Sequence, residues 1–258
     1  MKKHRPMFDS CRRVGAMVSP LLIVAGTILT LTPSYAVEFP PSGGRGAPAR
    51  TAGGGMRGDS CSAAEQGNLT VLTPPNNTNT FVGDEVKLLF YVPEVTNRTA
   101  EIYVEDPETF DVVYEASFPL DNTPGIVAVS FPAVNQTTGE ALVTGVDYPW
   151  EFAIVCNPSD RAIDLAVSGL IQPMELSTAV AEELETLALP NDVPSLQSAE
   201  VHANAGIWQE TVTQLAALRC SSESNWVELL TSVDLEELTE TSLNHCTASG
   251  TASGTASE

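Results

Sequence analysis

The segment YPWEFAIVC, residues 148–156, is the stretch that decides the fold. Tyr148, Trp150 and Phe152 occupy every second position in it, and the apolar series continues to its last residue. Successive side chains of an extended chain point to opposite faces, so this period of two places all the aromatic rings on one face. The segment therefore predicts a β-strand with one face in a hydrophobic core.

The residues before this segment predict a particular corner. Leu142 and Gly145 precede Tyr148 in steps of three. A tyrosine that opens a strand after such a corner resembles the tyrosine corner of immunoglobulin-like sandwiches, where the hydroxyl bonds the backbone a few residues upstream. Short apolar runs with turn signals between them lie on both sides. We expect strands at Thr70–Thr73, Val86–Val92, Ala100–Glu105, Asp111–Phe118, Ile126–Phe131, Tyr148–Cys156 and Ala162–Gln172.

Residues 61–172 are therefore predicted to form an immunoglobulin-like β-sandwich. After residue 172 the apolar period changes to the helical one. A first helix carries its apolar residues at Leu176, Val180, Leu184 and Leu187. Further helices are expected over 195–205, after Trp208 with Thr211, Leu215 and Leu218 inward, over 225–231, and from Asp234. The predicted fold class is a multi-part α+β chain, in which a small α-helical bundle over residues 173–246 follows the sandwich.

The first 36 residues have the parts of a secretory signal peptide. A basic head is followed by an uncharged stretch over 14–37, whose densest apolar part is Leu21–Leu31, and Ser34-Tyr35-Ala36 offers small residues for cleavage. The alternative, an uncleaved membrane anchor, needs about 20 mostly apolar residues and would have to include several Ser, Thr and Pro. We expect cleavage after Ala36, a mature protein in the periplasm or outside the cell, and no membrane span in it.

Two further segments lack a hydrophobic period. Residues 37–60 are rich in Gly, Pro and Arg and predict a flexible arm. An alternative for this arm is an anion-binding nest of glycine N–H groups and arginines. Residues 247–258 nearly repeat Thr-Ala-Ser-Gly and predict a disordered low-complexity tail.

Charge restricts the partners. Removing the first 36 residues leaves seven basic and 32 acidic residues, a net charge of −25. Nucleic acids and anionic lipids are bound through Lys and Arg, so a chain this acidic predicts no nucleic-acid partner. Glu105, Asp106, Glu108 and Asp111 cluster between two expected strands. These carboxylates permit weak divalent cation binding, although they lack the spacing of a calcium loop and a solvated acidic turn is the simpler interpretation.

The cysteines fit an oxidising compartment. Cys61, Cys156, Cys220 and Cys246 remain after the signal, and four cysteines allow three pairings. We favour Cys61–Cys156 and Cys220–Cys246, which keep each disulfide inside one predicted part. A four-cysteine zinc site is the alternative, but it needs close pairs such as C-x-x-C.

Catalytic motifs are absent from the sequence. Neither G-x-S-x-G nor H-E-x-x-H occurs, and neither His202 nor His245 belongs to a nucleophile or zinc motif. We therefore predict no catalytic residue, no metal site and no cofactor. Trp150, Phe152, Trp208 and Trp226 are expected in the core, with an exposed binding platform as the alternative for the tryptophans.

Short motifs along the chain together resemble a known family. They are Arg45-Gly46-Ala47-Pro48, Gly53-Gly54-Gly55, Arg57-Gly58 and Cys61, Phe90-Tyr91-Val92-Pro93, Pro124-Gly125-Ile126-Val127, Tyr148-x-Trp150-x-Phe152-x-x-x-Cys156, Gly169-x-Ile171-Gln172, Ala205-Gly206-Ile207-Trp208 and Leu215-Ala216-x-Leu218-Arg219. In this order they resemble the cyanobacterial domain-of-unknown-function 928 family, from about Arg45 to Cys246. The resemblance implies an exported cyanobacterial protein and implies no activity.

Two functions follow from these features. The first is a non-catalytic protein-interaction module that binds an unidentified protein of the cell envelope. The second is a hydrolase of envelope polysaccharide that uses two carboxylates about 5–10 Å apart in a cleft.

Mass spectrometry of the exported protein tests the processing and the disulfides. We expect an N-terminus at Val37 and disulfide-linked peptides that join Cys61 to Cys156 and Cys220 to Cys246. Free thiols, a crossed linkage, or a mature chain that still contains Leu21 would contradict this prediction.

Overall fold

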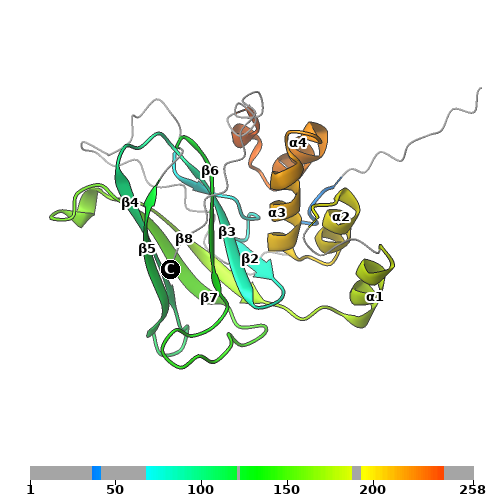
Figure 1. Cartoon of the computed structure of the whole chain (residues 1–258), viewed down its shortest axis with the longest axis horizontal. Coiled ribbons are helices and arrows are strands. Elements are labelled where there is room, and N and C mark those ends of the chain that lie inside the picture. Colours follow the sequence, from blue (N-terminus) through cyan, green and yellow to red (C-terminus); the bar gives the residue numbers. More distant parts are fainter. Residues whose placement is uncertain (1–36, 42–67, 121–122, 188–192, 241–258) are drawn as a thin grey trace, which may run out of the picture. The chain divides into compact units, whose positions relative to one another are not determined.

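The computed structural model describes residues 37–41, 68–120, 123–187 and 193–240. Within these ranges the chain forms strands first and helices afterwards (Figure 1). The strands are β1 (Thr70–Val71), β2 (Thr78–Phe81), β3 (Glu85–Val92), β4 (Arg98–Glu105), β5 (Val112–Leu120), β6 (Gly125–Pro132), β7 (Tyr148–Val155) and β8 (Leu165–Pro173). The helices are α1 (Thr178–Thr186), α2 (Leu196–Asn204), α3 (Trp208–Leu218) and α4 (Glu223–Ser232), with 3₁₀ turns η1 (Arg161–Ile163) and η2 (Glu236–Leu238).

The strands pair into two sheets. One has the order β1-β3-β6 and is antiparallel throughout. The other has the order β2-β8-β7-β4-β5, in which β2 runs parallel to β8 and the remaining pairs are antiparallel. Two sheets followed by helices make this an α+β fold, as the change of period after residue 172 predicts.

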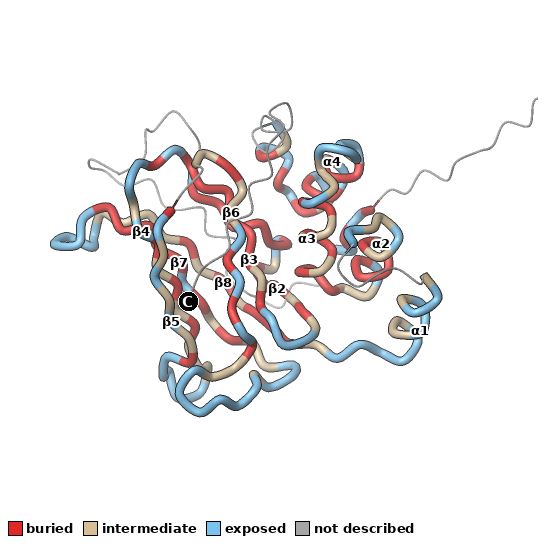
Figure 2. The backbone as a smooth tube through the Cα atoms, in the orientation of Figure 1, coloured by how far each residue is buried: buried red, intermediate tan, exposed pale blue. Residues whose placement is uncertain are grey.

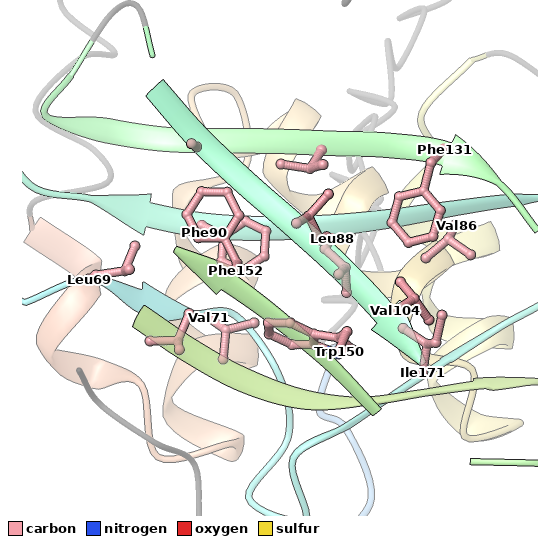
Figure 3. Packing of buried hydrophobic residues seen from close by; sticks show 14 of the residues in the cluster. Leu69, Val71, Val86, Leu88, Phe90, Val104, Phe131, Trp150, Phe152 and Ile171 are labelled. Atoms are coloured by element: carbon pink, nitrogen blue, oxygen red, sulfur yellow. The ribbon is translucent and has the colours of Figure 1, made fainter. Parts of the chain in front are cut away.

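The inner faces of the two sheets share one hydrophobic core. Phe90 on β3 stacks on Phe152 of β7 with ring centroids 4.1 Å apart, and it meets the edge of Trp150 at 5.6 Å (Figure 3). Trp150 and Phe152 are both buried, on the face that the period-two pattern assigns to the core. The aromatic residues of β7 therefore join the sheets.

The corner before β7 is closed by its tyrosine. The Tyr148 hydroxyl accepts a hydrogen bond of 2.9 Å from the N–H of Val143, five residues upstream. Gly145 between them has a φ of 79°, in the left-handed region that favours glycine, and Leu142 packs against the core. These contacts fix the path of the chain into β7.

A second core lies on the other side of β3. Leu89 and Tyr91 alternate with the inward residues of this strand and pack with the helices, where Trp208 and Trp226 are completely buried. Figure 2 shows α3 buried along much of its length. The helices α2, α3 and α4 thus cover a sheet and share its core.

The start of the predicted flexible arm is part of this second core. Val37 is completely buried, and Phe39 meets the edge of the Trp208 ring at 5.0 Å. The N–H of Phe39 also donates to the Ser232 hydroxyl at 3.1 Å. Val37 and Phe39 are therefore packed, contrary to the prediction of a flexible arm, because both apolar side chains belong to the second core, where Phe39 meets the tryptophan. Residues 42–60, like the signal 1–36 and the tail 247–258, lie outside the described residues.

Some elements differ from the prediction. β2 has the sequence TNTF, whose polar residues gave no strand pattern. Asn79 is buried with its amide nitrogen 3.5 Å from the Gln209 side-chain oxygen, and the half-buried Thr80 donates to the carbonyl of Gly206, just before α3. The run expected from residue 162 begins as a strand at Leu165, after η1. The helix expected from Asp234 is the short turn η2. Helix α1 has no buried residue, so its apolar series faces no core.

Gly169 on β8 gives a test of the sheet core. A Cβ at this position would lie 2.7 Å from the Trp150 ring and 3.0 Å from the Asn77 side-chain oxygen. We expect Gly169→Ala to lower the free energy of unfolding by about 1–3 kcal/mol, because a packed core resists added volume. Urea denaturation measures the loss, with exposed Ser130→Ala on β6 as a control expected within about 0.5 kcal/mol of wild type. Equal stability of both variants would contradict the packing.

Candidate functional site

The Thr80 side chain on β2 forms hydrogen bonds with the backbone at the start of α3. The Thr80 hydroxyl donates to the carbonyl of Gly206 and accepts from the N–H of Trp208, both at 2.8 Å. The Trp208 ring N–H donates to the Leu72 carbonyl, also at 2.8 Å. The first N–H groups of a helix lack partners within it, so Thr80 supplies one from outside the helix.

Gln209 fastens the same turn to β3. Its side-chain oxygen accepts from the N–H of Lys87 at 2.6 Å, and its amide nitrogen donates to the carbonyl of Glu85 at 3.0 Å. These two backbone groups are two residues apart on one edge of β3, where a neighbouring strand would otherwise pair. One carboxamide thus covers an open stretch of sheet edge, which protects it from other strands.

Glu210 follows and is the most perturbed carboxyl group at this junction. One of its oxygens accepts from the N–H of Val82 at 3.4 Å and from the Gln209 amide at 3.2 Å. The other oxygen is buried without a hydrogen-bond partner. Burial raises the pKa of Glu210 to about 7, although these hydrogen bonds and the Lys87 ammonium lower it in part. We call Thr80, Lys87, Gln209 and Glu210 the α3 junction; sequence reasoning missed it, because its members come from three separate elements.

His202 lies in α2 and takes part in a structural contact. Its Nδ1 lies 2.7 Å from the carbonyl oxygen of Ser198, one helical turn earlier, and 3.3 Å from the Gln214 amide nitrogen. A ring nitrogen so close to a carbonyl oxygen carries the proton, so it is no base for the Ser198 hydroxyl at 3.4 Å. Burial lowers the pKa of His202, which favours its neutral form. His245 lies outside the described residues.

The acidic cluster between β4 and β5 forms a braced turn. One oxygen of Asp106 accepts from the N–H groups of Glu108 and Thr109, both at 2.9 Å, and these bonds lower the pKa of Asp106. Among the described residues, no group of three or more His, Cys, Asp or Glu side chains is arranged to hold a metal ion. The acidic side chains of this turn are thus not gathered into such a group.

Phe110 stands at the end of this turn, where sequence reasoning did not single it out. Its side chain is 73% exposed, and its φ of 62° lies in the left-handed region. Its N–H donates to the Asp106 carbonyl at 2.9 Å, and Val112 beside it is 43% exposed. A bulky residue rarely adopts this conformation, and the turn holds the ring outward at a cost of about 1–2 kcal/mol. We call residues 105–112 the hairpin tip.

In the part of the chain that the structure describes, acidic residues lie near one another around Arg161 and around a hollow beside α2. Arg161 binds both Glu101 at 2.7 Å and Asp164 at 2.5 Å, so this half-buried pair of carboxylates is occupied by a guanidinium. A hollow of about 310 Å³ is lined by Glu38 and Glu200, together with Phe39, Pro40, Pro41 and Asn204. Only the second pair faces an open space.

Comparison with known proteins adds a family. The pattern of the family described as Domain of Unknown Function (DUF928) matches residues 52–243. The chain belongs to the DUF928 family. This description assigns no activity, and a comparison with curated proteins found no match. A superoxide reductase (neelaredoxin) from Ignicoccus hospitalis aligns with 43% of this chain and 82% of its own, at 16% identity and a TM-score of 0.28, which supports no argument about fold or function.

The cysteines of this DUF928 chain are only partly described. Cys156 is buried just after β7, and Cys220 is exposed just after α3. The favoured partners, Cys61 and Cys246, lie outside the described residues, so the pairings stay predictions.

The large aromatic residues of the DUF928 chain lie inside it. Trp150 and Phe152 belong to the core between the sheets, and Trp208 and Trp226 to the core under the helices. None of these tryptophans is therefore an exposed binding platform. No helix within the described ranges is both long and apolar enough to cross a bilayer.

The perturbed pKa of Glu210 predicts a stability that depends on pH. The folded protein holds a proton on Glu210 up to about pH 7, whereas the unfolded chain loses it near 4.5. Folding therefore binds a proton between these values, and the stability that it contributes is lost as the pH rises through this window. The difference corresponds to about 3 kcal/mol.

We expect Glu210→Gln to raise the free energy of unfolding by up to about 3 kcal/mol above pH 7 and to have little effect below about pH 4.5. Denaturation at a series of pH values measures this difference. Glu228→Gln, at an exposed position in α4, is the control and should follow wild type. Parallel curves for wild type and Glu210→Gln would contradict the assignment.

Proposed function

We propose that this DUF928 protein is a non-catalytic interaction module of the cell envelope that contacts a protein partner through its hairpin tip. Its first 36 residues support export, and we place the mature protein in the periplasm or outside the cell. The single observation that carries the interaction is the exposed Phe110 in a left-handed conformation. Strained residues persist where the surrounding structure holds them for a purpose, and exposed aromatic rings are frequent anchors of protein interfaces.

The chemistry of the tip indicates the kind of partner. Phe110 and Val112 are apolar and exposed, and the acidic Glu105, Glu108 and Asp111 belong to the same hairpin tip. The partner surface that fits is an apolar pocket with a basic rim, because opposite charges at the rim steer association and suppress wrong partners. The asparagine, aspartate and glycine residues usual in such turns would give the hairpin without offering an anchor.

We also propose that the two sheets form an immunoglobulin-like sandwich. The order β1-β3-β6 corresponds to strands A, B and E of that fold, and β4-β7-β8 to strands C, F and G. The Tyr148 hydrogen bond at the start of β7 is a further support, since the tyrosine corner opens strand F. In such sandwiches the loops lie at the two ends of the sheets, and the turn between β4 and β5 is one of these loops.

A second candidate is a hydrolase of envelope polysaccharide. The observation that favours it is the hollow between Glu38 and Glu200, where two carboxylates face one open space. Catalysis by such a pair needs one protonated and one ionised carboxyl group on opposite sides of a sugar bond. The interaction module remains our conclusion, since it uses a feature that costs stability and has no role in the core.

Binding to an envelope extract with Phe110→Gly tests the proposed function. Glycine adopts a φ of 62° without strain, so we expect the free energy of unfolding of this variant to be about 1 kcal/mol higher than that of wild type. We expect it to bind the wild-type partner at least about tenfold more weakly, because an interface anchor is lost. Urea denaturation measures the stability, and affinity capture followed by titration with the captured protein measures the binding.

Val193→Ala is the matched control, because Val193 is 53% exposed and lies far from the tip in sequence. It should capture the same partner with wild-type affinity. Equal capture by wild type and Phe110→Gly would remove the hairpin tip from the interaction. Hydrolysis of envelope polysaccharide by wild type, lost in Glu200→Gln, would replace the interaction module with the second candidate.

A further inference from the structure

Glu210 occupies a position that links three elements, directly or through Gln209. It lies in the first turn of α3, it accepts from the N–H of Val82 at the end of β2, and the Gln209 amide that it contacts also donates to Glu85 on β3. It is the only titratable residue of α3. Any movement of this carboxyl group therefore affects how the helix meets both sheets.

Gln209 is the link between the carboxyl group and the sheet edge. Its amide nitrogen is shared between Glu85 and Glu210, and its oxygen accepts from Lys87. Withdrawal of Glu210 removes one of the two acceptors that orient this nitrogen, so the carboxamide loses part of its support. The N–H of Val82 loses its carboxylate acceptor at the same time.

Few charged groups are available to stabilise an ionised Glu210 in place. Lys87 on β3 is the one whose charge acts on it, but the same ammonium lies 3.6 Å from Glu85. β2 carries no ionisable side chain, and Asp84 in the connection to β3 is exposed and acidic. On α2, which packs against α3, His202 contacts Ser198 and Gln214. The second oxygen of Glu210 has no donor.

We propose that the first turn of α3 is a proton-controlled latch between the helices and the two sheets, closed while the Glu210 carboxyl is protonated. When the group gives its proton to water, a carboxylate with one unpaired buried oxygen is left, and burial of such a charge is unfavourable. The carboxylate then moves toward solvent, Val82 is released, and the contacts of Gln209 with β3 open more often. This device goes beyond the proposed interaction at the hairpin tip and does not rest on it.

Hydrogen exchange at single amides tests the latch in the full mature protein. The reporters are the N–H groups of Val82, Lys87 and Trp208, which are bonded at the α3 junction. After correction for intrinsic rates, we expect their opening constants to rise at least about tenfold between about pH 5 and about pH 8. The N–H of Gln136, which donates to Val113 on β5 at the opposite end of the sheet from β2, is the internal reference and should not change.

Two variants distinguish opening that is caused by ionisation of Glu210 from a general loss of stability at high pH. In Glu210→Gln the opening constants of the three reporters should be independent of pH, while Glu228→Gln should behave as wild type. Wild-type reporters that do not respond to pH, or an equal response in Glu210→Gln, would overturn the proposal. If Glu210→Gln does not fold, carbon NMR of the wild-type carboxyl group decides instead: titration near 4.5 overturns the latch, and titration near 7 together with the rise at the reporters supports it.

Discussion

Strand β3 is buried on both faces, and the rest of the structure depends on this constraint. Leu88 and Phe90 face the other sheet, while Leu89 and Tyr91 face the helices. Burying an apolar side chain contributes about 1.5–3 kcal/mol, so a strand that buries two sets of residues holds two cores together. The sheets and the helices therefore do not have separate interiors.

The two cores meet along an edge that needs special protection. β1 pairs with β3 over only two residues, which leaves backbone groups near Glu85 and Lys87 without a neighbouring strand. The side chain of Gln209 supplies both missing hydrogen bonds. Placing a polar turn of α3 over the edge also buries Glu210, and the raised pKa of that group is a consequence of how the edge is closed.

The hairpin tip and the α3 junction illustrate two different relations between stability and function. At the α3 junction, hydrogen bonds between side chains and backbone groups join the helix to the sheets, and the second oxygen of Glu210 is buried without such a bond. At the tip, Asp106 and its turn hold Phe110 in an unfavourable backbone conformation with its ring in water. Neither feature contributes to a core, and this distinguishes both from the aromatic residues that sequence reasoning assigned to packing.

The sequence by itself determined the elements whose apolar period is long. Tyr148, Trp150 and Phe152 predicted a strand and its buried face, because side-chain direction in a strand follows from position alone. The same reasoning placed α2, α3 and α4 within a few residues. It also identified the family, since its motifs are distributed along almost the whole matched range.

Only the tertiary structure decided the α3 junction, the packing of Val37 and Phe39, and the exposure of Phe110. β2 has too few apolar residues to show a period, and the partners of its Asn79 and Thr80 side chains lie in α3 and just before it, far along the chain. The pKa of Glu210 depends on three elements that are distant in the chain. Burial and hydrogen bonding of this kind are properties of the assembled fold, and no local pattern of residues carries them.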